Sequence, residues 1–131
     1  MLRIFASIVI FSLFIFGSNI KVITSKDGLI NSISKEQLIK IYLKEIDSIN
    51  GVRVIPIDNS NSKIYNEFYA KLIHKTPKQI RAYWMKEIYR GDKQPPKRLS
   101  ESEIAEKIKI EPNIIYYSYD KLSGKIIFNL K

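Results

Sequence analysis

A polar run from Asp58 to Lys63 holds the side chains whose types and spacing could bind a ligand. It follows a β-branched stretch at 52–57 and precedes a helical pattern with Ile64, Phe68 and Leu72 on one stripe. The first N–H groups of a helix have no partner within the helix, and the helix dipole favours an anion there. The candidate ligand-binding residues are therefore Asp58, Asn59, Ser60, Asn61, Ser62 and Lys63. The same pattern also fits a simpler interpretation, in which these residues only cap the helix.

The rest of the sequence offers little for catalysis. His74 is the only histidine, and it lies near the end of the same predicted helix, where a cation suits the helix dipole. The chain has no cysteine, which excludes a Cys–His pair, and a single histidine argues against a histidine-based metal site. Neither a Gly-rich nucleotide loop nor a Gly-x-Ser-x-Gly elbow occurs. We therefore expect a binding protein that is not an enzyme and carries no cofactor or metal.

The charge balance indicates what kind of partner the chain takes. Its 131 residues include 22 Lys and Arg against 13 Asp and Glu, a formal net charge of +9. Such an excess favours anionic partners, among them small oxyanions, acidic envelope polymers, lipid headgroups and nucleic acid. The export signal described next argues against nucleic acid.

The first 18 residues have the pattern of a targeting segment. Arg3 provides a positive start, the run 4–16 is apolar apart from two serines, and Gly17-Ser18 supplies small residues. This predicts a signal peptide at 1–18 and an exported, periplasmic protein. A retained N-terminal anchor is the alternative, because bulky Ile15 or Phe16 occupies a place where signal peptidases prefer a small residue. Residues 20–131 then suffice for a single domain.

The predicted elements on both sides of the polar run alternate between strands and capped helices. Strands are expected at 20–24, 52–57, 114–119 and 125–130, with a loop at 90–97. Helices are expected after capping boxes at Ser34-Lys-Glu-Gln37, Thr76-Pro-Lys-Gln79 and Ser100-Glu-Ser-Glu103. This order predicts an α/β fold with helices covering a small mixed sheet. Side chains expected in the core include Leu38, Ile41, Tyr42, Phe68, Ile80, Trp84, Ile88, Ile104, Ile108, Tyr116 and Tyr117.

Four segments, taken together, resemble a known group. They are 33–43, 52–68, 81–91 with the following Pro95-Pro96, and 111–117. In this order and spacing they are similar to short exported proteins related to the phosphate-binding component of ABC phosphate transporters. The resemblance covers about Ile20 to Leu130. It implies one lobe of a type II periplasmic solute-binding protein, where full-length relatives close two lobes on phosphate.

This sequence differs from those relatives in the loop that binds phosphate. Relatives hold phosphate with helix N-termini, hydroxyls and an arginine from an Arg-Ser-Asp-Gly-Ser-Gly-Thr loop. Matched by its distance to Phe68, that loop places Ser62 on the second serine and Asp58 on the arginine. A carboxylate at this position repels a phosphate dianion unless it accepts a proton-bearing oxygen or points away.

Two hypotheses follow. In the first, the chain is a solute-binding-like module for phosphate or a similar oxyanion, linked to phosphate ABC transport. In the second, it is a non-catalytic cell-envelope interaction protein that keeps the fold and has lost ligand binding. The expected protein partners are an ABC transporter permease, another envelope protein or a second copy of the chain.

Overall fold

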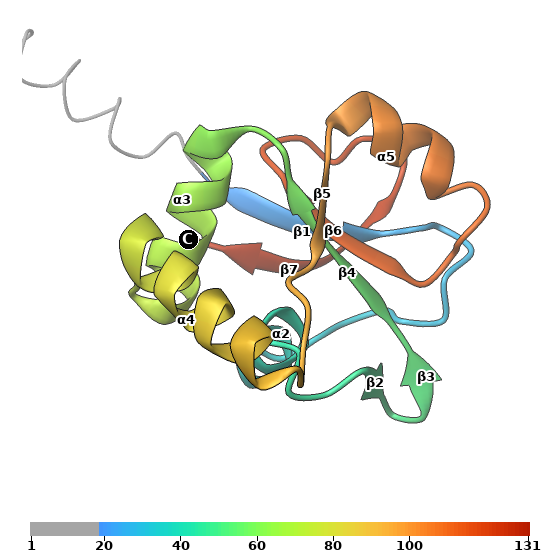
Figure 1. The fold of residues 1–131 in the computed structure, drawn as a ribbon. Coiled ribbons are helices and arrows are strands. Elements are labelled where there is room, and N and C mark those ends of the chain that lie inside the picture. The colour runs from blue at the N-terminus through green and yellow to red at the C-terminus, as the bar shows by residue number, and fades with distance from the viewer. Residues whose placement is uncertain (1–18) are drawn as a thin grey trace, which may run out of the picture.

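A computed structural model describes residues 19–131 (Figure 1). The predicted signal peptide therefore lies outside the described residues. The elements are β1 (Ile20–Thr24), α2 (Lys35–Tyr42), β2 (Ser48–Ile49), β3 (Val52–Arg53), β4 (Ile55–Asn59), α3 (Ser62–Ile73), α4 (Pro77–Arg90), β5 (Lys97–Leu99), α5 (Glu101–Lys107), β6 (Ile114–Ser118) and β7 (Lys125–Leu130). Among residues 19–131, no helix combines the length and the apolar character needed to cross a membrane.

Five strands form one mixed sheet in the order β5-β4-β6-β1-β7. The strands β5, β4 and β6 run parallel, with Asp58 opposite Arg98 and Ile55 opposite Ile114. The strands β6 and β7 both pair with β1 in the antiparallel sense. The α/β prediction with a small mixed sheet flanked by helices is thus confirmed, and the three parallel strands require the helical crossovers that the sequence supplies.

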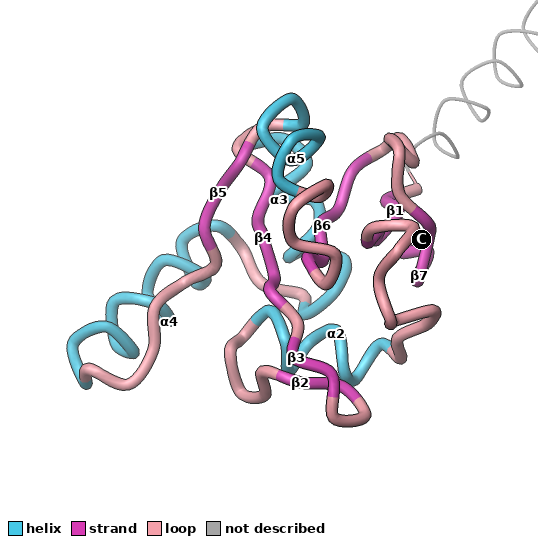
Figure 2. Tube along the Cα trace, turned by 90° about the vertical axis from the view of Figure 1, so that its right-hand side faces the viewer, coloured by secondary structure: helices cyan, strands magenta, loops and turns pink. Residues whose placement is uncertain are grey.

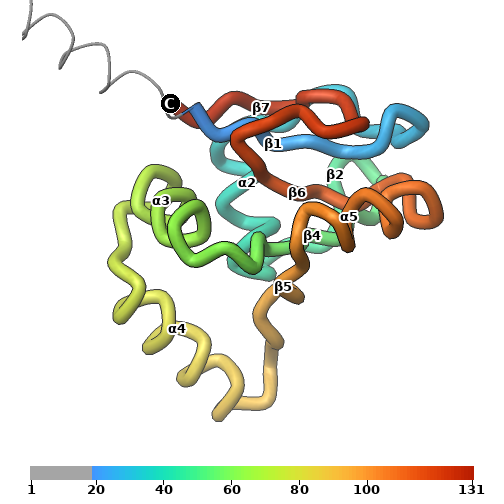
Figure 3. Tube along the Cα trace, turned by 90° about the horizontal axis from the view of Figure 1, so that it is seen from above, coloured from blue at the N-terminus to red at the C-terminus, as the bar shows by residue number. Residues whose placement is uncertain are grey.

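The sheet separates two apolar clusters, because alternate side chains of a strand point to opposite faces. On β6, Ile115 and Tyr117 pack in the larger cluster with residues of α2, α3 and α4. Ile114 and Tyr116 pack in a smaller cluster with Ile104 of α5. Viewed from above, α2 and α3 lie on one side of the sheet, and α4 lies beyond α3 at the margin (Figure 3).

Local sequence signals account for most helix boundaries. All three capping boxes are present, and each Ser or Thr cap accepts a hydrogen bond from the backbone N–H three residues later. The expected core is confirmed with one exception. Ile88 of α4 is 45% exposed, while Glu87 is buried in its place. Glu87 is held there by Arg90 and Lys93, whose nitrogens lie 3.8 and 4.0 Å from its carboxylate oxygens.

The strand expected at 52–57 is in fact two strands. The Asn50-Gly51 pair has positive φ values of 50° and 82°, which fits a tight two-residue hairpin turn. The turn joins β2 to β3, and only then does the chain enter the main sheet as β4. Figure 2 shows this small hairpin below the sheet. The predictions also missed β5, whose first residue, Lys97, was expected to be the last residue of the loop.

The polar loop expected to begin at Asp58 begins later. Asp58 and Asn59 belong to β4, and both are almost completely buried. Polar side chains remain in a buried strand only when hydrogen-bond partners are available. Here Tyr69 and Tyr117 donate to Asp58, and Asn59 donates to the carbonyl of Tyr117.

Candidate functional site

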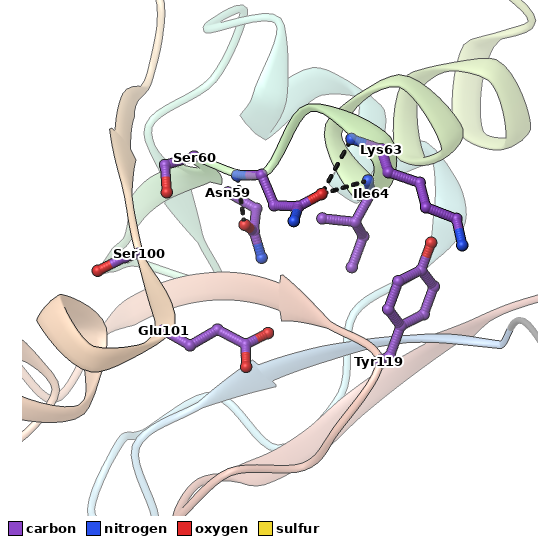
Figure 4. Close-up of a pocket in the computed structure, with 8 residues that line it drawn as sticks. Asn59, Ser60, Lys63, Ile64, Ser100, Glu101 and Tyr119 are labelled. Atoms are coloured by element: carbon purple, nitrogen blue, oxygen red, sulfur yellow. Dashed lines mark hydrogen bonds between the residues drawn. The ribbon is translucent and has the colours of Figure 1, made fainter.

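A pocket lies where the three parallel strands end. It has a volume of about 430 Å³ and is lined by Asn59, Ser60, Asn61, Lys63, Ile64, Ser100, Glu101 and Tyr119. We call it the strand-end pocket (Figure 4). These residues come from the end of β4, the start of α3, the connection from β5 to α5, and the residue after β6. In open α/β sheets, ligands bind outside the carboxyl ends of the strands, which is where this pocket lies.

The start of α3 forms one wall, and its backbone donors are largely occupied. The Asn61 Oδ1 caps the helix by accepting hydrogen bonds from the N–H groups of Lys63 and Ile64, at 3.0 and 3.5 Å. The Ser60 N–H donates to Leu99 at 3.0 Å. The Asn61 N–H donates to Asn59 Oδ1 at 2.9 Å. An anion at this helix start therefore has to compete with the side chain of Asn61 for the two capped amides.

Polar side chains from α3 and from the residues that follow β5 and β6 also line the pocket. Figure 4 shows Lys63 and Tyr119 with their polar ends pointing to the same side of the pocket. The Tyr119 hydroxyl donates to Glu67 Oε1 at 3.2 Å, so its oxygen is already positioned. Ser100 contributes a hydroxyl that accepts a hydrogen bond from the Glu103 N–H. An ammonium group and three residues with hydroxyls thus line the same pocket, with Lys63 and Tyr119 on one side of it and Ser60 and Ser100 on the other.

Glu101 brings a negative charge into the same pocket. Its carboxylate accepts a hydrogen bond from the Ser118 hydroxyl. Figure 4 shows the carboxylate directed toward the start of α3. A carboxylate repels an unprotonated anion but accepts a hydrogen bond from a protonated oxygen of a ligand. The pocket therefore combines cationic and hydroxyl donors with one strong acceptor.

The structure brings together four of the six predicted ligand-binding residues. Asn59, Ser60, Asn61 and Lys63 line the strand-end pocket, whereas Asp58 and Ser62 do not. Asp58 is instead among the residues that line a separate groove beside α4. The Asn61 side chain caps α3, as the simpler interpretation of the polar run predicts.

Sequence reasoning missed Ser100, Glu101 and Tyr119 as pocket residues. Their signal was a capping box directly after a strand and a polar residue after another strand. The capping box alone does not place Ser100 and Glu101 at the edge of the sheet, because β5 before it has only three residues and is defined by its pairing with β4.

Asp58 is buried in a cluster of tyrosines. Tyr69 donates to both of its oxygens at 3.0 Å, and Tyr117 donates at 2.8 Å. Burial raises the pKa of Asp58 to about 7, and the hydrogen bonds from Tyr117 and Tyr69 oppose that rise, as does the charge of Arg98. Asp58 is therefore a titratable group of the protein interior.

Arg98 holds the loop between β4 and α3 through hydrogen bonds to two backbone carbonyls. Its Nε donates to the carbonyl of Asn59 at 3.2 Å, and a terminal nitrogen donates to the carbonyl of Ser60 at 3.4 Å. Its guanidinium also lies 3.9 Å from the centre of the Tyr65 ring, which restricts its motion. Arg98 is the cross-strand partner of Asp58, so a guanidinium lies on the neighbouring strand at this level of the sheet.

A metal-dependent arrangement is not seen in the described part of the chain. Among residues 19–131, no group of three or more His, Asp or Glu side chains is placed to hold a metal ion. The chemistry that the strand-end pocket offers is hydrogen bonding and charge.

Comparison with protein-family models gives no match, and neither does comparison with the sequences of curated proteins. Solved structures do match. One is a protein from Clostridium perfringens assigned as a phosphate ABC transporter substrate-binding protein and solved with bound phosphate, with a TM-score of 0.58 and 15% identity. Another is an ABC-type phosphate transport receptor from Vibrio cholerae, with a TM-score of 0.60 and 12% identity.

Each of these matches covers 84% of this chain but only 45% of the solved chain. The chain therefore spans less than half the length of the structures that it resembles. At this level of identity the likeness shows the fold, which corresponds to one lobe of a phosphate-binding protein.

Proposed function

We propose that the chain is a solute-binding-like module that takes phosphate or a similar oxyanion in the strand-end pocket. The observation that carries this proposal is that Lys63, three residues with hydroxyls and the start of α3 line one pocket at the carboxyl ends of three parallel strands. Those hydroxyls belong to Ser60, Ser100 and Tyr119. The fold shared with phosphate-binding proteins supports the same proposal.

Glu101 narrows the class of oxyanion. Its carboxylate accepts a hydrogen bond only from an oxygen that carries a proton. Near neutral pH, phosphate still carries at least one proton and sulfate carries none. We therefore expect the pocket to prefer phosphate over sulfate, with Glu101 excluding the fully ionised anion by charge repulsion.

The affinity should be modest. Tight sites bury most of the ligand surface, and a pocket on one lobe leaves part of the ligand in contact with solvent. Asn61 adds a further cost, because its side chain must release two amides before they can bind the anion.

Isothermal titration calorimetry of phosphate and sulfate at low and at moderate salt tests this proposal. We expect saturable one-to-one binding of phosphate that persists at moderate salt. Lys63→Gln should weaken it, while Lys86→Gln, which removes the same charge from the exposed side of α4, should not. Glu101→Gln should reduce the preference for phosphate over sulfate. Binding that salt abolishes, or that both lysine variants weaken equally, would mean that only general charge attracts the anion.

The second candidate is an envelope interaction protein without a ligand. The self-capped start of α3 and the Glu101 carboxylate favour it, since both oppose anion binding. So do the exposed apolar side chains of α4, which suit a partner. Under this candidate the partner is an ABC transporter permease, another envelope protein or a second copy, in the periplasm. Light scattering after size exclusion and cross-linking in envelope fractions test it, and a monomer that captures no partner contradicts it.

A further inference from the structure

The helix α4 carries exposed apolar side chains that nothing in the described structure covers, two of them at the groove beside the helix. Met85, Ile88 and Tyr89 are 72%, 45% and 93% exposed. Their spacing of three and four residues places them on one side of the helix. Pro95, which is also exposed, lines the same groove as Met85 and Ile88. We call Met85, Ile88, Tyr89 and Pro95 the α4 patch.

The surroundings of the α4 patch are strongly basic. Residues 77–98 contain seven cations and two acids, so this segment carries +5 of the chain's formal +9. One of the acids, Glu87, is buried and lies within 4.0 Å of Arg90 and Lys93 nitrogens, which leaves Asp92 as the exposed acid of the segment. The cations are Lys78, Arg81, Lys86, Arg90, Lys93, Lys97 and Arg98.

The position of α4 leaves the patch open to a flat surface. The helix attaches to the body through its inner side, where Ile80 and Trp84 are buried in the larger apolar cluster. In Figures 1, 2 and 3 the helix lies along the outer margin of the molecule. The side of the helix opposite Ile80 and Trp84, which includes Tyr89, therefore faces away from the sheet.

We propose that α4 docks on an anionic phospholipid surface. The aromatic ring of Tyr89 and the side chains of Met85 and Ile88 enter the interfacial region, while the exposed Lys78, Arg81 and Lys86 reach lipid phosphates with their long side chains. A second copy of the chain is unsuited to this surface, because the two segments of charge +5 would face and repel each other. The inference does not depend on the strand-end pocket.

The absence of cysteine makes the contact directly measurable. In the full chain, Tyr89→Cys introduces a single thiol that takes a polarity-sensitive fluorophore. Ile110→Cys, at a position that is 80% exposed in the native chain, is the matched control at the other side of the molecule, after α5. The probes are vesicles of phosphatidylglycerol and phosphatidylcholine in equal parts, and vesicles of phosphatidylcholine alone. We expect a blue shift of the emission at 89 on the mixed vesicles and not on the neutral ones. At 110 we expect no shift.

Charge variants separate a local contact from general attraction. Lys78→Gln with Lys86→Gln should raise the lipid concentration at half-maximal shift, by about fivefold for each charge removed. Lys26→Gln with Lys109→Gln removes the same charge from the loop after β1 and the end of α5, which Figure 1 shows on the side opposite α4, and should leave it unchanged. All four lysines are exposed, and thermal unfolding by circular dichroism confirms that each variant folds.

If residues 1–18 bind the chain to every vesicle, the comparison between positions 89 and 110 still tells whether α4 contacts the lipid. No shift at 89, or an equal shift at 89 and 110, overturns the proposal. So does an equal effect of the two lysine pairs. An equal shift with soluble polyglutamate, which has no interface to enter, also overturns it and favours an acidic protein partner instead.

Discussion

At the residue scale, the most informative group is Asp58. It occupies a position where the resemblance calls for an arginine, yet its carboxylate does not line the strand-end pocket. It is buried under the hydroxyls of Tyr69 and Tyr117 and is electrostatically coupled to the charge of Arg98. The carboxylate that stands where the resemblance calls for an arginine is therefore buried in the interior and does not face the strand-end pocket.

Asp58 predicts a pH dependence of stability. Because its pKa is raised from 3.8 to about 7, the folded chain keeps a proton that the unfolded chain releases between these pH values. Stability should therefore fall as the pH rises from about 4 to about 7, by about 4 kcal/mol from this group. This fall in the free energy of unfolding should be absent in Asp58→Asn and present in Asp27→Asn, a variant at an exposed position. Urea unfolding across that range measures the difference, and parallel profiles for the wild type and Asp58→Asn would contradict it.

Tyr117→Phe tests the hydrogen bonds that hold the carboxylate. The variant keeps the ring that stacks on Phe68, with centroids 3.7 Å apart, and loses the donor at 2.8 Å from Asp58. We expect a loss of about 1–3 kcal/mol, larger above pH 7 where Asp58 is ionised. Tyr89→Phe, on an exposed ring, is the control and should change the free energy of unfolding little. A loss that does not depend on pH would argue against a role for the Tyr117 hydroxyl on the carboxylate.

At the element scale, the start of α3 decides how well the pocket binds an anion. Asn61 both caps the helix and occupies the amides of Lys63 and Ile64. Glycine is almost as good at this position for helix stability, with a cost of a few tenths of a kcal/mol. It has no side chain to compete with an anion.

Asn61→Gly should therefore increase phosphate affinity severalfold while changing the melting temperature little. Calorimetric titration and thermal unfolding measure the two effects separately. A control variant, Thr76→Gly, relaxes the cap of α4 in the same way and should leave phosphate binding unchanged. Weaker binding by Asn61→Gly would show that the Asn61 side chain itself contacts the anion.

Helices were predicted from the sequence more accurately than strands. The three capping boxes are local, so Ser34, Thr76 and Ser100 marked helix starts without knowledge of the fold. The strand β5 has three residues and is defined by its pairing with β4, which no local pattern contains. Without β5, the sequence also offered no reason to place Glu101 in the pocket. The burial of Asp58 could not be predicted because its partners Tyr69 and Tyr117 lie 11 and 59 residues away in the sequence.

At the scale of the whole molecule, the described fold is one lobe with its pocket at one end of the parallel strands. Two-lobed binding proteins close on their ligands by hinge motion. Within residues 19–131 no second lobe exists to close.

Saturating phosphate should therefore leave the radius of gyration in small-angle scattering unchanged, even as it raises the melting temperature through binding to the folded state. Sulfate at the same ionic strength is the control. A smaller radius with phosphate would indicate a conformational change that this structure does not contain. A larger one would indicate that phosphate promotes association.

The pairing of β1 with β7 gives the molecule a mechanical weak point. Ile20 lies opposite Leu130, so the first and last strands of the described sheet are antiparallel neighbours whose outer ends meet. A force that pulls on these two ends acts across the strands and breaks their hydrogen bonds one pair at a time. Strands pulled along their length instead share the force among all of their bonds. The lobe should therefore unzip at low force from the β1–β7 edge, whereas tethers at opposite ends of the parallel strands β4 and β5 would shear that pair and meet greater resistance.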